Sequence, residues 1–226
     1  MALRGAAFLG LWHDIQPEAQ AEYDEWHTRE HMPERLALPG FLMGRRLVDR
    51  NAETLRYGTI YEATSVEAFR SPEYLARLNA PSAWSAKMMP FFRNMLRVSC
   101  ERVATSGPCD GGAMMTVRLM LPGGEARFTE AAPALVAALN ERPGIVGAHA
   151  AVARPEASSI RTNEMAARPK SDVTGFDAVV LVEGVGIPEL QREAARLLKL
   201  ITASRTGAAR PAMGIYEVAC SLAGKG

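Results

Sequence analysis

The sequence lacks the features that mark secreted and membrane proteins. Its three cysteines, Cys100, Cys109 and Cys220, are odd in number and widely spaced, which fits neither a disulfide framework nor the spacing of zinc ligands. Reduced cysteines are typical of cytoplasmic proteins, and we expect that location. No apolar run reaches the ~20 residues that a membrane-spanning helix needs. Residues 1–12 have no small-residue cleavage site, so we expect a first strand there and not a signal peptide.

The charge balance points to no macromolecular partner. Lys and Arg total 26 against 25 Asp and Glu, which leaves a net charge of +1. This balance gives no electrostatic reason to expect nucleic acid or an anionic membrane as a partner. The sequence also lacks the Gly-rich dinucleotide loop, the phosphate-binding P-loop and the kinase signature. We therefore expect a small-molecule ligand and no bound cofactor.

What the sequence does contain is a repeated order of elements. The Gly- and Pro-rich stretch 104–112 cuts the chain near its middle. Each half then predicts a strand, a helix, a Pro-Gly turn, two strands, a helix and a strand. The predicted strands span 6–12, 41–48, 54–61, 94–103, 114–121, 145–153, 178–183 and 213–222, and the main helices span 17–36, 66–70, 126–141 and 188–201.

This order, βαββαβ in each half, is the ferredoxin-like plan. The sequence therefore predicts an α+β protein of two tandem ferredoxin-like units with antiparallel sheets, one over 1–105 and a degenerate one over 113–226, joined by a linker at 106–112. Segment 154–175 has no counterpart in the first half. A loop of that length is usually functional or disordered, and its residues favour neither.

The two halves differ in the side chains that could do chemistry. All three Trp, four of five Tyr, five of seven Phe and three of four His precede residue 106. Ligand pockets are usually lined by apolar and aromatic side chains with a few placed polar groups. A repeat that served only as a scaffold would not need this asymmetry, so we expect the site in the first half.

The predicted helix 17–36 is the centre of this argument. A helix packed on a sheet buries one face, yet the large side chains at helical spacing here are Tyr23, Trp26, His27 and His31, with no Leu, Ile or Val between them. Polar atoms on a buried face need partners. The corresponding helix of the second half has an ordinary apolar stripe, so the first helix gives up core quality for polar groups.

The two histidines of this helix have two interpretations. His27 and His31 are four residues apart and so lie on one face. Histidine can take or give a proton near neutral pH, which suits acid/base catalysis or ligand binding. A structural role is the alternative, because a cation is favoured near a helix C-terminus and Asp24 or Glu34 would pair with the imidazoles.

The same stretch, 27–31, reads H-x-x-E-H, which is a zinc-protease pattern. Pro33 is expected to end or kink the helix directly after it, and no third ligand is evident in the sequence. With His13 added, a three-histidine metal site is conceivable, but we expect no metal.

Further candidates lie on the predicted strands. Alternation sends one of two adjacent arginines inward, where it would hold an anionic or carbonyl group, and two tyrosines of equal parity would line a cavity. Ordinary packing or a surface ion pair is the alternative for each. The residues are Trp12 and His13 at the end of the first strand, Arg45 and Arg46 on the second, and Tyr57 and Tyr61 on the third.

The run Tyr23-Asp-Glu-Trp-His-Thr-Arg-Glu-His-Met-Pro-Glu-Arg-Leu-Ala-Leu-Pro-Gly-Phe41 resembles the EthD-like branch of the dimeric α/β-barrel superfamily. The resemblance implies two ferredoxin-like sheets facing each other as a barrel, here within one chain, with helices outside. It implies a cleft for small apolar or aromatic molecules. It also places the histidine that several members use at His31, with Trp26, Glu30 and Phe41 around it. Relatives include cyclases, isomerases, decarboxylases, cofactor-free monooxygenases and haem enzymes.

We therefore hypothesise an enzyme that acts on a small apolar or aromatic, carbonyl-containing substrate. His31 would be the acid/base group, and His27 or Tyr23 would assist it. Arg45 or Arg46 would orient a polarised oxygen. A lyase, isomerase, cyclase or cofactor-free monooxygenase reaction fits such a site.

Two other functions stay open at this point. One is a non-catalytic module that binds a small molecule, as in a stress response, with His31 in a structural role. The other is a haem enzyme with His31 or His13 as the axial ligand. Exposed sheet edges also favour a homodimer.

Overall fold

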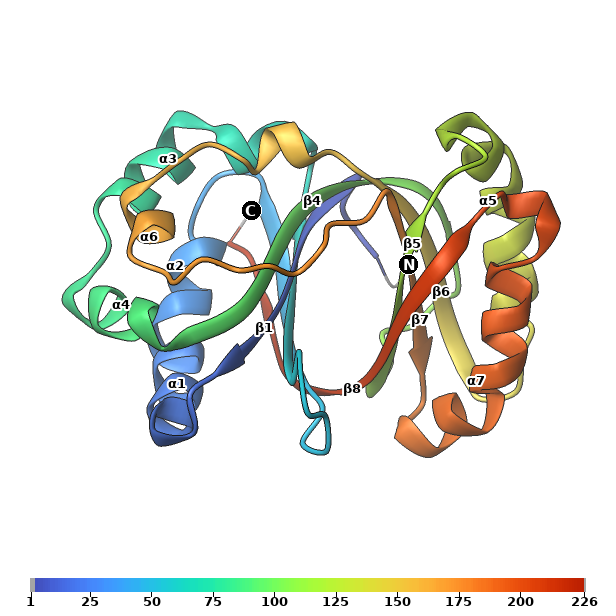
Figure 1. The fold of residues 1–226 in the computed structure, drawn as a ribbon, viewed down its shortest axis with the longest axis horizontal. Helices are drawn as coiled ribbons and strands as arrows, with labels where there is room; N and C mark the ends of the chain where they lie inside the picture. Colours follow the sequence, from blue (N-terminus) through green and yellow to red (C-terminus); the bar gives the residue numbers. More distant parts are fainter. Residues whose placement is uncertain (1–2, 226) are drawn as a thin grey trace. The chain divides into compact units, whose positions relative to one another are not determined.

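The computed structural model describes residues 3–225, apart from the side chain of Ser204, and alternates strands with helices (Figure 1). The strands are β1 (Ala7–Ile15), β2 (Phe41–Val48), β3 (Tyr57–Ala63), β4 (Phe92–Ser106), β5 (Ala113–Met120), β6 (Ile145–Ala153), β7 (Ala178–Gly184) and β8 (Ala209–Ala223). The helices are α1 (Gln20–Trp26), α2 (Met32–Leu36), α3 (Pro72–Asn79), α4 (Ala83–Met88), α5 (Glu125–Asn140), α6 (Asn163–Ala166) and α7 (Ile187–Ile201). None of the helices within residues 3–225 combines the length and apolar character needed to cross a bilayer.

The chain forms two compact units. The N-terminal unit contains Gly5–Ser99, Arg154–Gly175 and the end of β8 from Ala219, and the C-terminal unit consists mainly of Cys100–Ala153 and Phe176–Val218. These units differ from the sequence halves because β4 and β8 each pass from one unit to the other, and because segment 154–175 belongs with the N-terminal unit. The longest strands of the chain are therefore shared, which the sequence halves did not predict.

The strands follow the hydrogen-bonded order β1-β3-β2-β8-β5-β7-β6-β4, which closes on itself as a barrel. In the N-terminal unit β3 pairs antiparallel with both β1 and β2. In the C-terminal unit β5 pairs antiparallel with β7 and β8, and β6 with β4 and β7. The predicted fold class, two tandem ferredoxin-like units whose antiparallel strands form an intrachain α/β barrel, is confirmed.

The C-terminal unit has an ordinary apolar core. Its helices α5 and α7 lie side by side along one face of the sheet (Figure 1). Alternate residues of the strands, such as Val180 and Val182, face these helices and contact Phe128, Leu135 and Leu139 of α5 in one buried cluster. Burying each such side chain contributes about 1.5–3 kcal/mol to the free energy of unfolding. Apolar packing therefore accounts for the attachment of these helices to the sheet.

In the N-terminal unit, a buried glutamate lies on the face of the sheet that points away from the helices. Glu62 of β3 accepts a hydrogen bond from Arg45 of β2 at 2.9 Å and another from the backbone N–H of Gly5 at 3.4 Å. Both side chains are fully buried. The carboxylate therefore ties the second strand and the start of the first strand to the third.

The C-terminal sheet carries the same device. Glu183 of β7 lies 3.0 Å from Nε2 of His149 on β6, and it accepts a hydrogen bond of 2.7 Å from the backbone N–H of Gly111, just before β5. Thr105 lies 2.7 Å from the other nitrogen of His149. The correspondence of strand, carboxylate and glycine supports the internal repeat more directly than the shared Pro-Gly turns do.

The predicted helix 17–36 consists of four consecutive short helical segments. A 3₁₀ turn at Pro17–Ala19 precedes α1, a π turn at His27–His31 follows it, and α2 completes the run. The helix continues to Leu36, as the predicted range 17–36 has it, so of the two effects expected of Pro33, an end or a kink, the structure does not show the end. Proline has no N–H to donate, and Pro33 lies in the first turn of α2, just after the π turn has already displaced the regular hydrogen-bond pattern.

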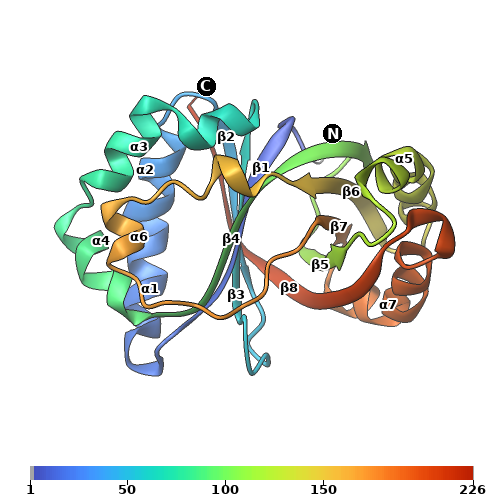
Figure 2. The same cartoon turned by 45° about the horizontal axis from the view of Figure 1, so that its top comes forward.

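Segment 154–175, here called the strap, is ordered against the N-terminal unit (Figure 2). Its helix α6 begins beside the end of α3, where the backbone N–H and side chain of Asn163 both donate to Asn79. Farther back, Ser158 accepts from the backbone N–H of Ser99 at 3.0 Å and from Arg97 through its carbonyl at 2.5 Å. The strap thus adds side chains from beyond residue 153 to the half that is rich in histidine and aromatic residues.

Candidate functional site

The candidate site is a cluster of three buried histidines in the N-terminal unit. His13 lies on β1, and His27 and His31 begin and end the π turn. Their relative exposures are 1%, 3% and 5%. A single π turn within a helix often occurs at a functional site, and this one places both histidines of the helix on the side that faces β1 and β3.

Aromatic rings join the histidines to one another. The His31 ring lies 4.3 Å from the Trp26 ring and 5.5 Å from the His27 ring, measured between centroids. Tyr23, one turn earlier, lies 5.2 Å from His27 and 5.4 Å from His13. The hydroxyl of Tyr23 is also 3.2 Å from Nε2 of His13, within hydrogen-bond distance. The predicted helix face of Tyr23, Trp26, His27 and His31 is therefore a continuous aromatic surface.

Strand β3 supplies the wall opposite the helix. Tyr57, Thr59 and Tyr61 alternate along β3 and share its helix-facing side. Tyr57 stacks on His13 with the ring planes 16° apart, and the hydroxyl of Thr59 lies 3.4 Å from Nε2 of His27. Tyr57 and Tyr61 therefore lie on the same side of β3, as their equal parity predicts.

Several buried polar atoms of this cluster have no hydrogen-bond partner among the described residues. They include Nδ1 of His27 and of His31, the hydroxyl of Tyr61 and one guanidinium nitrogen of Arg35. A buried polar atom without a partner costs about 1–3 kcal/mol. Native proteins rarely leave such groups unexplained, and a bound ligand with polar atoms of its own would satisfy them.

Burial keeps the three imidazoles neutral. Loss of hydration, followed by the positive charge of Arg168, lowers the pKa of His13 to about 3. The pKa values of His27 and His31 are also well below the usual value, first through burial and then through Arg46 and Arg35 respectively. Neutral imidazole carries a free lone pair at pH 7, so each of these side chains can accept a proton or a hydrogen bond.

Two buried tyrosines, one on α1 and one on β3, have the opposite tendency. Burial raises the pKa of Tyr23 and of Tyr61 well above the usual value for a phenol. Both hydroxyls therefore stay protonated at neutral pH and can donate to an oxygen of a ligand. The cluster thus combines neutral imidazoles, each with one lone pair, with phenols that retain their protons.

Glu30 positions the Trp26 ring through two serines and, among the described residues, forms no hydrogen bond to a histidine. Its carboxylate accepts from the hydroxyls of Ser82 and Ser85, at 2.5 Å and 3.4 Å. Ser85 in turn accepts from the indole N–H of Trp26 at 3.2 Å. This chain fixes the indole against His31, so Glu30 is a positioning residue.

Of the two predicted arginines, Arg46 lies on the side of the site and Arg45 does not. Arg46 is paired across the sheet with Thr59, and it donates to the carboxylate of Asp24 on α1 at 2.9 Å. Arg45 faces the other side of the sheet, where Glu62 binds it. The reason is a bulge between Phe41 and Met43, which shifts the parity of β2.

Two other predicted side chains lie outside the cluster. Trp12 is buried on the opposite face of β1 from His13, since alternate residues of a strand point to opposite faces. Phe41 packs with Tyr61, Phe69 and Tyr74 in a neighbouring apolar cluster. These positions favour roles in packing for both.

The strap contributes charged groups that the sequence reasoning missed. Glu164 forms salt bridges with Arg35 of α2 and with Arg168, and both bridges are buried. The guanidinium of Arg168 lies 5.0 Å from the centroid of the Phe92 ring. The only signal in the sequence was the length of a segment without a counterpart in the first half.

A metal is not supported by this geometry. Within residues 3–225, no three His, Cys, Asp or Glu side chains are grouped closely enough to hold a metal ion. The carboxylate of the H-x-x-E-H pattern, Glu30, is engaged by serine hydroxyls. Sequence spacing alone did not distinguish this aromatic cluster from a zinc site.

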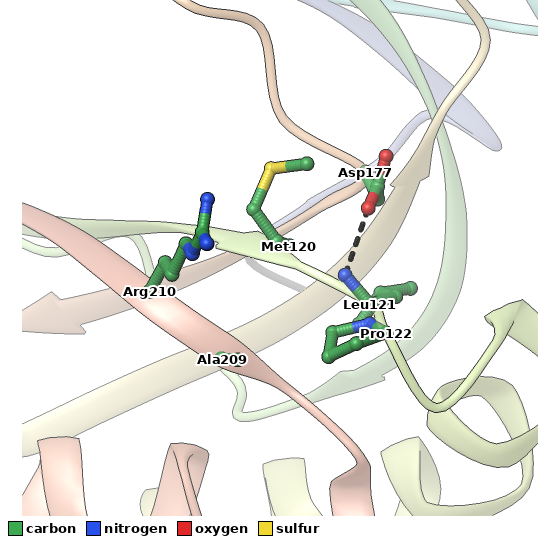
Figure 3. A pocket seen from close by; sticks show the side chains of 6 residues that line it. All are labelled: Met120, Leu121, Pro122, Asp177, Ala209 and Arg210. Carbon is green, nitrogen blue, oxygen red and sulfur yellow. Dashed lines mark hydrogen bonds between the residues drawn. The ribbon is translucent and has the colours of Figure 1, made fainter.

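The C-terminal unit has a pocket of a different kind, of about 350 Å³ (Figure 3). Its charged groups are Asp177 and Arg210, both exposed, and the carboxylate of Asp177 accepts from the backbone N–H of Leu121 at 2.8 Å. No histidine lines this pocket. The buried bases of the described chain are thus concentrated in the N-terminal unit.

The comparisons with known proteins identify the fold. No protein-family model matches the chain, and no curated protein matches it. Among solved structures, an anthrone oxidase-like protein superposes with a TM-score of 0.64 at 12% identity, over 100% of this chain and 97% of its own. A candidate monooxygenase from Fusobacterium nucleatum has a TM-score of 0.59 at 15% identity, over 99% and 97%. Another from Lactobacillus acidophilus has 0.54 at 8%, over 96% and 98%. At these identities the likeness shows a common fold over the whole chain.

Proposed function

We propose that the protein is an enzyme in which a buried neutral histidine removes a proton from a small aromatic, carbonyl-containing molecule. One observation carries this proposal: His27 and His31 are buried among aromatic rings, and each has a nitrogen without a partner among the described residues. Their lowered pKa values keep both rings neutral, with one lone pair each. His31 is the proposed base, and Tyr61 is a proposed donor to the substrate oxygen. No bound cofactor is required for this step.

The chemistry of the proposed step follows from the charges. When Nδ1 or Nε2 of His31 takes a proton from a carbon that a carbonyl group activates, either directly or through an aromatic ring, the electron pair moves to the carbonyl oxygen and an enolate forms. The protonated phenol of Tyr61 can donate a hydrogen bond to that oxygen. The neutral imidazole has the lone pair that this transfer needs. Burial lowers its basicity, because it disfavours the imidazolium that forms.

The further fate of the enolate is the finer part of the proposal. Reprotonation elsewhere would give an isomerase or cyclase, and reaction with O₂ would give a cofactor-free oxygenase. The fold neighbours named anthrone oxidase-like and monooxygenase favour oxygenation. The run Tyr23–Phe41 supports an EthD-like relationship, which we also propose.

The test uses anthrone, an aromatic ketone whose methylene hydrogens are acidic. Under nitrogen in D₂O, the protein should accelerate exchange of these hydrogens, as followed by mass spectrometry. In air, anthrone and O₂ should give anthraquinone and water in equal amounts. 2-Tetralone serves as a second enolisable ketone. His31→Gln should lower the exchange rate at least 100-fold, since general-base catalysis contributes about 10²–10⁴.

A matched control separates loss of the base from loss of the fold. Tyr216→Phe changes a buried aromatic residue of the C-terminal unit and should leave exchange within twofold of wild type. Far-UV circular dichroism should be unchanged in both variants. If wild type and His31→Gln exchange either ketone at the same rate, the proposed role of His31 is wrong.

A further inference from the structure

A small cavity lies between the strap and β4, next to the histidine cluster. Its volume is about 220 Å³. The lining residues come from β4 on one side and from the strap on the other, and they are Met95, Arg97, Met165, Arg168, Pro169 and Ser171. Two of the six are arginines, one from each side. A cavity of this size holds a polar group of a substrate more readily than a whole polycyclic molecule.

The arginines around this cavity outnumber the carboxylates. Arg168 and Arg35 both form their salt bridges with Glu164. Arg97 donates to the hydroxyl of Tyr74 at 3.0 Å and to a backbone carbonyl of the strap, which are uncharged acceptors. Two guanidinium groups thus share one carboxylate and the third has uncharged partners, so the three together carry more positive charge than Glu164 balances.

This excess charge is held in a poorly hydrated place. Arg35 and Arg168 are almost fully buried, and the guanidinium groups of Arg35 and Arg97 each lie 5.9 Å from the ring centroid of Tyr74. Burial and the like charge of Arg97 both lower the pKa of Arg168. Buried charges are normally paired, so the cluster is incomplete without one more anion.

The same arginines connect the cavity to the candidate base. The positive charges of Arg35 and Arg168 both lower the pKa of His31, and Arg168 lies over the ring of Phe92. Phe92 belongs to the apolar cluster that contains Tyr23 and Trp26. A ligand whose charged group binds at Arg168 would therefore have the Phe92 ring within reach of its aromatic part.

We propose that the substrate is an aromatic carboxylate whose carboxylate group binds in this cavity between Arg97 of β4 and Arg168 of the strap. Planar guanidinium groups bind carboxylates by charge-assisted, frequently paired hydrogen bonds. This inference rests on the proposed function, because it names the substrate class of the same site. It assigns the strap a direct part in substrate binding.

Binding of 2-naphthoate and of its neutral analogue 2-naphthamide tests the proposal. Equilibrium dialysis should give a Kd for naphthoate at least 10-fold lower than that for naphthamide. Arg97→Gln and Arg168→Gln should each raise the naphthoate Kd at least 10-fold and change the naphthamide Kd less than twofold. Arg168→Lys, which retains the charge, should keep most of the affinity.

Arg29→Gln is the matched control, since Arg29 is an exposed arginine that pairs with Glu25 on the same helix. It should leave both constants unchanged. If naphthoate fails to bind, binds no better than naphthamide, or is unaffected by both glutamine variants, the proposal is wrong. The anthrone assay distinguishes the two ideas: a defect of His31→Gln on that neutral ketone would support the proposed function even if the carboxylate preference were absent.

Discussion

The first helix of each unit occupies the same place in the ferredoxin-like order, but the two helices bury opposite kinds of side chain. α5 presents Phe128, Leu135 and Leu139 to its sheet. The run from α1 to α2 presents aromatic rings and imidazoles, interrupted by a π turn. One copy of the unit thus supplies apolar packing, and the other has exchanged part of that packing for groups that can bind or transfer protons.

This comparison indicates how a repeat can acquire a site without changing its fold. The sheets of the two units share their pairing pattern and their buried glutamates, Glu62 and Glu183. What differs is the helix and the segment that packs on it. The groups of the proposed function therefore lie on a face of one helix and in one inserted segment, in line with the general separation of site from fold.

The largest expected difference between the two units is the loss of stability that acid causes through the histidines of the N-terminal unit. The folded-state pKa values of His13, His27 and His31 are below the usual 6.5, so below pH 6.5 the unfolded chain binds protons that the folded chain does not. Stability is then lost as pH falls from 6.5 toward the folded pKa values. At pH 5 each histidine should cost about 2 kcal/mol relative to pH 7.5.

Urea unfolding of wild type and of a His27→Gln/His31→Gln double variant at the two pH values measures this effect. The double variant should lose about 4 kcal/mol less than wild type between pH 7.5 and pH 5. Carboxylates are common to both proteins, so their contribution cancels in the difference. Equal losses in the two proteins would show that these imidazoles are not held neutral by the fold.

Shortening a buried side chain in the core of the C-terminal unit should lower the stability of the protein and leave its activity unchanged. Leu135 is fully buried in the α5 cluster. Leu135→Ala should lower the free energy of unfolding by about 3 kcal/mol, through lost apolar contact and a residual cavity. Activity per folded molecule, measured as anthrone exchange at 15 °C, should stay within twofold of wild type. A large loss of activity would instead couple the C-terminal core to the site.

Removal of a buried hydroxyl should have the smallest effect on stability, with opposite signs in the site and elsewhere. The Tyr61 hydroxyl is buried without a partner among the described residues, so Tyr61→Phe should raise the free energy of unfolding by about 1 kcal/mol. The buried hydroxyl of Thr206 donates to a backbone carbonyl at 2.9 Å, and Thr206→Val should cost about 1.5 kcal/mol. Similar costs in the two variants would mean that Tyr61 has a protein partner after all.

The sequence was sufficient for the fold because local signals agreed with one another. Strand-like runs, two Pro-Gly turns and the order of elements predicted both ferredoxin-like units. The helix with Tyr23, His27 and His31 was recognisable as a site because it lacks the apolar stripe that a scaffold helix needs. These inferences depend only on residues that are close in the chain.

The rest of the site depends on pairings that no local pattern encodes. The bulge at Phe41/Met43 decides which arginine faces the helix, and periodicity alone cannot locate it. Arg35 and Glu164 are 129 positions apart in the sequence. The salt bridge between them follows from the path of the strap over the unit, and that path is set by tertiary packing.

The strap is attached at both ends, since β6 precedes it and β7 follows it. Arg168 and Glu164 therefore reach their partners in the N-terminal unit as a tethered ligand would, at an effective concentration on the order of millimolar. A free peptide of the same sequence would have to be supplied at about that concentration to replace a deleted strap. The chain thus carries one wall of the proposed binding site as a permanently linked second component.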